Sequence, residues 1–175
     1  METDLEIVAL GCIALSGCAV AVNRCKEQLN NRFREDLLEK VVWMGSEYAT
    51  FCREDFSEAE AFIAAGRGGI FAALWDIAEE LNSGLYVNLK SIPVYQETIE
   101  ICNYLDINPY ELESKGMYLL AVKKGYEFCE KMRNNGHIAE IIGNTTDSND
   151  RIVMNGELIR YIEKNRGKDE IERIR

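Results

Sequence analysis

The chain has 175 residues, of which 47% are hydrophobic and 29% are charged, and its formal net charge is −10. This length fits one domain with a buried core, and the acidic excess excludes a surface built to bind nucleic acid or an anionic membrane, because no basic field offsets phosphate repulsion. No apolar run reaches the roughly 18 residues that span a membrane, and Met1 to Asp4 lack the positive start of a signal peptide, so we expect a cytoplasmic protein.

The first third of the chain predicts one strand and a series of helices. An unbroken apolar run at residues 7–10 predicts a buried strand. Apolar residues at helical spacing predict helices over about residues 17–30 and 34–44. Ser57, with Glu60 three residues later, has the pattern of a capping box and predicts a further helix start. The expected inner faces are Val22, Cys25 and Leu29 in the first helix and Leu37, Leu38, Val41 and Val42 in the second.

A glycine loop opens the most regular helical pattern of the chain. The loop occupies residues 64–69, and Gly84 is placed to end the helix that follows it. Beyond Gly84, apolar residues alternate and predict a half-buried strand. The apolar stripe of the helix comprises Ile70, Leu74, Ile77 and Leu81, and the inward residues of the strand are Leu85, Val87 and Leu89.

The rest of the chain predicts alternating helices and strands and then a hairpin. Pro93 precedes a short helix, and Pro109 starts another helical turn. The apolar run 117–122 predicts a central strand, and residues 138–142 predict a further strand. An Asn-Gly dipeptide within residues 152–159 predicts a hairpin with a type I′ turn. The expected inner faces are Ile99, Cys102 and Leu105 in the short helix and Tyr126, Cys129 and Met132 in a helix over about residues 124–134.

The order of these elements predicts an α+β fold. Helices alternate with strands, but a hairpin closes the series, which favours a mixed β-sheet with helices packed on its faces. No internal repeat or low-complexity linker divides the sequence. We therefore expect a single domain at residues 1–162 and a charged tail at residues 163–175 that frays.

The chain contains six cysteines and one histidine. No two cysteines have the CxxC spacing, so we expect a reduced protein without disulfides and without a structural zinc site. Cys12 and Cys18 flank a loop of small residues with no base nearby in the sequence, and we expect both thiols to be buried and unreactive. Cys25, Cys102 and Cys129 fall on apolar helix faces, where cysteine acts as a small hydrophobic residue.

The segment Gly66-Arg67-Gly68-Gly69 is the sharpest candidate site. In one interpretation it binds phosphate, because glycines let backbone N–H groups approach an anion at a helix N-terminus and Arg67 adds a fixed charge. In the other it is a tight loop entering a closely packed helix, where glycine supplies a positive φ or small size. A glycine loop by itself leaves both interpretations open.

Other polar residues give weaker signals. His137 follows Asn134-Asn135-Gly136, a pattern typical of a solvated turn rather than of a catalytic base. Trp75 lies beside an apolar stripe, which favours a core or interface position. Three acidic groups raise the question of a metal site: Glu35-Asp36, Glu79-Glu80, and Glu111 with Glu113. Glu79 and Glu80 fall on the outer face of an amphipathic helix, which favours a solvated position, and we predict no catalytic or metal-binding residue.

Several segments, taken together, carry a family resemblance. They are Gly68 to Glu79, Ile92-Pro93-Val94, Glu97 to Cys102, Asn108-Pro109-Tyr110, Lys115-Gly116 and Ile141-Ile142-Gly143. Their order and spacing resemble the C-terminal domain of the aminoimidazole ribonucleotide synthetase superfamily, in its hydrogenase maturation protein E branch. Selenophosphate synthetase and thiamine-monophosphate kinase are related to that branch. The resemblance covers residues 66–162, and residues 13–19 are similar to the family's entry into this domain.

The resemblance implies the mixed-sheet fold of that C-terminal domain and a role beside a nucleotide. Members of the family are two-domain dimers that use Mg-ATP to phosphorylate or activate a substrate, and their N-terminal domain supplies the nucleotide cradle and most acidic metal ligands. Their C-terminal domain adds a His-Asp-x-Thr-x-Gly-Gly loop beside the phosphates, which matches Ile63 to Gly69 here. Only Gly68 and Gly69 of that pattern remain, and its acid and hydroxyl are absent.

Three functions are compatible with this resemblance. The first is a domain that is not catalytic alone and acts as a homodimer or with a separate N-terminal-type nucleotide-binding subunit, so that Mg-ATP binds only with the partner domain. The second is a module that binds a nucleotide or another phosphorylated metabolite through Gly66 to Gly69. The third is an active enzyme of ATP-dependent phosphotransfer or maturation. The missing acid and hydroxyl of the loop argue against the third, which ranks last, and the retained segments that define the fold support the first.

Overall fold

A computed structural model describes residues 4–174; residues 1–3 and 175 of the predicted domain and tail lie outside the described part. The helices are α1 (Leu15–Arg24), α2 (Lys26–Asn30), α3 (Glu35–Ser46), α4 (Gly69–Leu81), α5 (Gln96–Leu105) and α6 (Gly125–Asn134). The strands are β1 (Glu6–Leu10), β2 (Ala59–Ala64), β3 (Gly84–Asn88), β4 (Tyr118–Val122), β5 (Ala139–Thr146), β6 (Arg151–Asn155) and β7 (Leu158–Tyr161). None of the helices between residues 4 and 174 has the length and apolar character needed to cross a membrane.

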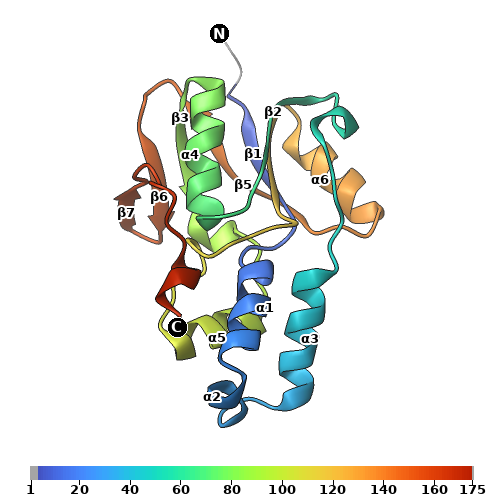
Figure 1. The fold of residues 1–175 in the computed structure, drawn as a ribbon. Helices are drawn as coiled ribbons and strands as arrows, with labels where there is room; N and C mark the ends of the chain where they lie inside the picture. The colour runs from blue at the N-terminus through green and yellow to red at the C-terminus, as the bar shows by residue number, and fades with distance from the viewer. Residues whose placement is uncertain (1–3, 175) are drawn as a thin grey trace.

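The strands form one seven-stranded sheet in the order β2-β4-β1-β5-β3-β6-β7 (Figure 1). Every neighbouring pair is antiparallel except β3 and β6, which run parallel. The sheet is therefore mixed. Because helices also pack on both of its faces, the structure confirms the predicted α+β fold.

The helices are distributed unevenly around the sheet. α4 packs on one face, whereas α1, α3 and α5 gather beyond one end of the strands (Figure 1). α6 packs on the opposite face, over β1, β4 and β5. β4 lies between the two helical layers, so all its residues are buried and its side chains alternate between them. Leu119 contributes to the core on the α4 side and Leu120 to the core on the α6 side.

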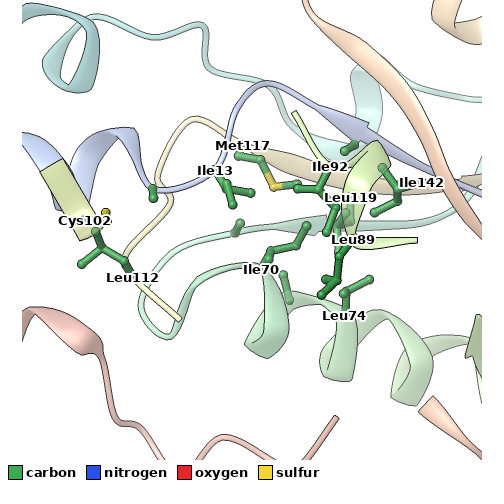
Figure 2. Close-up of a cluster of buried hydrophobic side chains, with 14 of the residues drawn as sticks. Ile13, Ile70, Leu74, Leu89, Ile92, Cys102, Leu112, Met117, Leu119 and Ile142 are labelled. Carbon is green, nitrogen blue, oxygen red and sulfur yellow. The ribbon is translucent and has the colours of Figure 1, made fainter. Parts of the chain in front are cut away.

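The larger of the two cores joins α4 and the N-terminal helices to the sheet. Figure 2 shows Ile70 and Leu74 of α4 among Leu89, Leu119 and Ile142, side chains that come from distant parts of the sequence. The smaller core forms where the apolar stripe of α6 meets β1 and β4. Its members include Val8, Leu10, Leu120, Val122, Phe128, Cys129 and Met132.

Most predicted helices are present, with different limits or inner residues. The first one divides into α1 and α2 at Cys25, whose φ of −111° and ψ of 24° leave the helical region. Asn82, in the left-handed conformation at φ 48°, ends α4 in place of Gly84, which is a buried residue of β3. On α6 the predicted inner residue Tyr126 is 64% exposed, and Phe128 takes its place in the core.

The helix starts predicted at Ser57 and Pro109 are wrong. The capping-box segment after Ser57 extends into β2, which pairs with β4, because long-range pairing outweighs a local helix signal. Around Pro109 the chain makes a turn, in which the side chain of Asn108 accepts a hydrogen bond from the Tyr110 N–H at 3.1 Å. Such an Asx turn replaces the first turn of a helix.

The predicted hairpin is present as β6 and β7, but its turn differs from the expected type. Asn155 pairs with Leu158, so Gly156 and Glu157 are the two turn residues. Only Gly156 has a positive φ, at 64°, whereas a type I′ turn requires a positive φ at both positions. A single positive φ at the first position is the pattern of a type II′ turn.

The C-terminal tail packs against the domain instead of fraying. Asp169 is only 5% exposed and Ile174 only 9% exposed. Between them lies a short 3-10 helix, η3 (Glu170–Arg173). The tail therefore contributes buried side chains, among them one carboxylate.

The core on the α4 side gives a stability prediction. We expect Leu74→Ala to lower the free energy of unfolding by about 2–5 kcal/mol, because it empties a fully buried position. The matched control is Leu158→Ala on β7, where the side chain is 69% exposed and the expected change is within about 0.5 kcal/mol. Urea unfolding measures both values, and equal losses would contradict this assignment of the core.

Candidate functional site

The glycine loop turns the chain from the end of β2 into the start of α4. Gly68 and Gly69 have φ of 83° and 67°, in the left-handed region that only glycine adopts without strain. A Cβ atom on Gly69 would lie 2.5 Å from the carbonyl oxygen of Tyr110, and one on Gly68 would lie 2.1 Å from Nδ2 of Asn165. A Cβ atom on Gly66 would meet nothing within 4 Å. Two of the three glycines are therefore required by backbone geometry alone.

Two backbone N–H groups of this loop, those of Gly68 and Gly69, already have acceptors. The Gly69 N–H donates to the carbonyl oxygen of Gly66 at 3.1 Å, within the loop itself. The Gly68 N–H donates to Oδ2 of Asp169 at 2.7 Å, in a buried contact between residues 101 positions apart. The donor that phosphate binding would use thus holds a carboxylate of the same chain.

Arg67 is engaged in the same way. Its guanidinium forms an ion pair with the carboxylate of Glu172, and its Nε donates to the carbonyl oxygen of Gly167 at 3.2 Å. Both side chains of the ion pair remain about half exposed, at 54% and 51%. Arg67 and the Gly68 N–H therefore both meet the C-terminal tail, whereas the Gly69 N–H is satisfied within the loop.

The tail is held in place by hydrogen bonds within itself and by one to another segment of the chain. Oδ1 of Asp169 accepts from the Ile171 N–H at 2.9 Å, which caps η3. Glu170 reaches another segment, since its carboxylate accepts from the Asn108 N–H at 2.8 Å. The side chain of Asn165 bonds both the N–H and the carbonyl oxygen of Lys168, at 2.9 Å each. Asp169 is thus presented to the loop by a folded segment.

A broad cleft of about 1140 Å³ lies beside the loop. Phe71 and Trp75 of α4 form part of its wall, and Arg160 of β7 and the tail form much of the rest. The Trp75 ring, predicted to be core or interface, is partly buried with the guanidinium of Arg151 stacked 3.7 Å above its centre. The cleft offers aromatic surface and charges of both signs next to the glycine loop.

The other predicted positions do not gather into a second site. His137 packs edge-on against Phe51, with ring centres 5.1 Å apart, beside a smaller cleft of about 290 Å³. Glu79 and Glu80 form ion pairs with Arg151 and Arg53. Among residues 4–174, no three or more histidine, cysteine, aspartate or glutamate side chains gather closely enough to hold a metal ion.

The thiols at the N-terminal loop are buried, as predicted. Burial raises the pKa of Cys12 to about 11. A hydrogen bond with Cys102, together with burial, raises the pKa of Cys18. Both residues therefore remain protonated near neutral pH and are poor nucleophiles. All six cysteines are free.

Sequence reasoning found the loop but missed its occupant. The segment Asp169 to Glu172 has the spacing of a helix cap, with an acidic residue three positions later, and this was the available local signal. Nothing in the sequence links it to Gly68, because their contact spans 101 positions. Chemically, the arrangement is a backbone donor and a guanidinium that hold two carboxylates.

Comparison with known proteins identifies the family. The chain belongs to the family described as AIR synthase related protein, C-terminal domain, whose pattern matches residues 52–155. A protein of Methanocaldococcus jannaschii named for hydrogenase expression and formation is 29% identical over 163 residues, which cover 87% of this chain and 45% of that protein. The resemblance read from the sequence is thereby confirmed.

Solved structures share the fold. Escherichia coli HypE, a hydrogenase maturation protein, matches with a TM-score of 0.71 at 15% identity, over 98% of this chain and 53% of its own. HypE in complex with ATP matches with a TM-score of 0.69 at 16% identity, over 98% and 53%. A chain of the HypE–HypF complex matches with a TM-score of 0.66 at 18% identity, over 94% and 54%. This chain spans about half the length of the proteins it matches.

The loop geometry predicts unequal effects of alanine at its glycines. We expect Gly69→Ala to lower the free energy of unfolding by about 2 kcal/mol or more, because it adds left-handed strain and a clash with the Tyr110 carbonyl. The control Gly66→Ala has open space around it and should change stability by no more than about 0.5 kcal/mol. Thermal and urea unfolding measure the difference, and equal effects would show that close packing does not require glycine at position 69.

Proposed function

We propose that this chain acts as the C-terminal half of an AIR synthase-related assembly, that it is not catalytic alone, and that it completes a nucleotide site together with a separate nucleotide-binding domain. The observation behind this proposal is the state of the glycine loop. The Gly68 N–H and the Arg67 guanidinium both hold carboxylates of the tail, so two groups that would bind phosphate are already engaged in the isolated chain. We expect the protein to work in the cytoplasm.

The loop also lacks the groups that chemistry would need. The positions that match the acid and the hydroxyl of the family pattern are Ala64 and Gly66. Neither side chain can bind a metal ion or move a proton. In a combined site, this chain would supply packing and the positive end of α4, and the partner domain would supply the metal ligands and bind Mg-ATP.

The proportions of the relatives support a missing partner. The chain covers 45% of the Methanocaldococcus jannaschii protein and 53% of HypE. HypE forms a complex with ATP, and it also forms a complex with the protein HypF. A chain of half that length needs the other half, on the same or another polypeptide, for a comparable site.

An exposed apolar face offers a surface for that partner. The half of the sheet formed by β3, β6 and β7 lies beyond the cover of α6. On the sheet face that α6 covers elsewhere, three large side chains of these strands are exposed: Tyr86 at 43%, Ile159 at 57% and Tyr161 at 64%. The pairing register places Ile152 and Met154 on the same face. A cluster of this kind on one sheet face is typical of a contact surface, and we assign it to the nucleotide-binding domain.

Complex formation tests this surface. We expect the chain to form a stable complex with the half of the Methanocaldococcus jannaschii relative that it does not match, as measured by size-exclusion chromatography with light scattering. Ile159→Asp should abolish the complex, because it puts a charge into the apolar face. Leu158→Asp is the matched control, since Leu158 is adjacent and exposed but points to the opposite face. Equal behaviour of the two variants, or self-association into a homodimer in place of the complex, would contradict the assignment.

Calorimetry with Mg-ATP and Mg-ADP tests the state of the isolated chain. We expect no saturable heat at millimolar nucleotide, because the Gly68 N–H and the Arg67 guanidinium are occupied. The control is Arg67→Ala, which should leave the result unchanged. Saturable binding that weakens in Arg67→Ala would instead support the second candidate function, a module for nucleotides or other phosphorylated metabolites.

A further inference from the structure

The C-terminal tail occupies the glycine loop in the manner of a bound anion. We propose that residues 165–174 form a latch, in which Asp169 and Glu172 hold the anion-binding groups of the loop and must leave before a phosphate group can bind there. This inference rests on the proposed function, in which the loop meets the phosphates of a nucleotide held with a partner domain. It adds the regulation of that site.

Two carboxylates of the tail each contact one of the two groups that would bind phosphate. Asp169 accepts the Gly68 N–H at 2.7 Å, and Glu172 pairs with Arg67. A helix N-terminus and a guanidinium are the usual pair of partners for phosphate oxygens. The loop is therefore assigned as an anion site from the anions that it holds, and not from its glycines alone.

Occupation by the tail and by phosphate exclude each other. Asp169 is 5% exposed and lies directly on the Gly68 N–H, so no second acceptor fits at that donor. Because the carboxylate belongs to the same chain, its effective concentration at the loop is high, on the order of millimolar for a short tether. The apparent dissociation constant for phosphate rises in inverse proportion to the fraction of molecules whose tail is open. A weak ligand therefore fails unless a partner contributes binding energy or releases the tail.

The attachment of the tail suits a part that can open. Figure 1 shows the C-terminal end of the chain, in red, beside one end of α4. Gly167 has a φ of 81° with open space around it, and its neighbours Arg166 and Lys168 are exposed. The ion pair of Arg67 with Glu172 is about half exposed, and exposed ion pairs are weak. Two side chains of the segment are buried, Asp169 and Ile174, and Ile171 packs partly buried against the core.

The test uses inorganic pyrophosphate as the probe, with amide shifts in ¹⁵N–¹H NMR spectra and calorimetry as readouts. We expect the double variant Asp169→Asn, Glu172→Gln to bind at least tenfold more tightly than the unmodified chain, with shifts at Gly68 and Gly69. Both substitutions keep the shape of the side chain and remove its charge. Adding Arg67→Ala to the double variant should remove the gain. The matched control is Glu170→Gln, because Glu170 contacts the Asn108 N–H and not the loop.

Two results would overturn the latch. One is equal pyrophosphate affinity in the double variant and the unmodified chain, and the other is binding of pyrophosphate without amide shifts at Gly68. If the double variant does not fold, the single variant Glu172→Gln decides, because Glu172 is exposed. It should still gain about threefold in affinity, and no gain would count against the latch. Failure of the partner complex with a gain in pyrophosphate affinity would remove the proposed function and leave the latch standing, and the reverse would remove only the latch.

Discussion

The close meeting of three chain segments at Gly68 and Gly69 is the constraint on which the region around the loop depends. Without side chains at these positions, α4 can begin against the carbonyl oxygen of Tyr110, and the Gly68 N–H can reach Asp169. With α4 beginning at this position, Ile70 and Leu74 point into the core that joins the helix to the sheet. The loop therefore fixes the position of its helix, the segment that contains Tyr110 and the tail together.

The elements that sequence reasoning found are those whose signal is contained in a short window. The stripe of α4 and the apolar run of β4 repeat at the period of one element, and both are present. β2 was read as a helix start, because its pairing with β4 lies about 60 positions away along the chain and leaves no local trace. The prediction that Tyr126 faces the core was wrong for a related reason. Helical spacing also allows Phe128 to face the core, and Phe128 is the buried residue. Which of two neighbouring apolar residues is buried depends on the sheet that the helix covers.

The candidate site likewise has one part with a local sequence signal and one part without. The loop was visible because glycines, an arginine and a following helix are adjacent in the sequence. Its occupant was not visible, because the contact between Gly68 and Asp169 joins residues 101 positions apart. The charged composition of the tail suggested solvation, yet charge alone does not determine burial. A carboxylate is buried at low cost when donors are placed to receive it, and the loop places a backbone N–H for this one.

The retained glycines and the lost acid of the family pattern have different physical meanings. Gly69 must remain a glycine whatever the protein does, because a Cβ atom there would lie 2.5 Å from a backbone oxygen. Its presence therefore carries information about the fold and none about phosphate. Position 64 is under no such constraint, since Ala64 is exposed at the end of β2, and the acid could be lost without harm to the packing. Under the proposed function, chemistry at the loop would depend on groups that lie outside it: the carboxylates of the tail, which contact Gly68 and Arg67, and a partner domain that would bring the metal ligands.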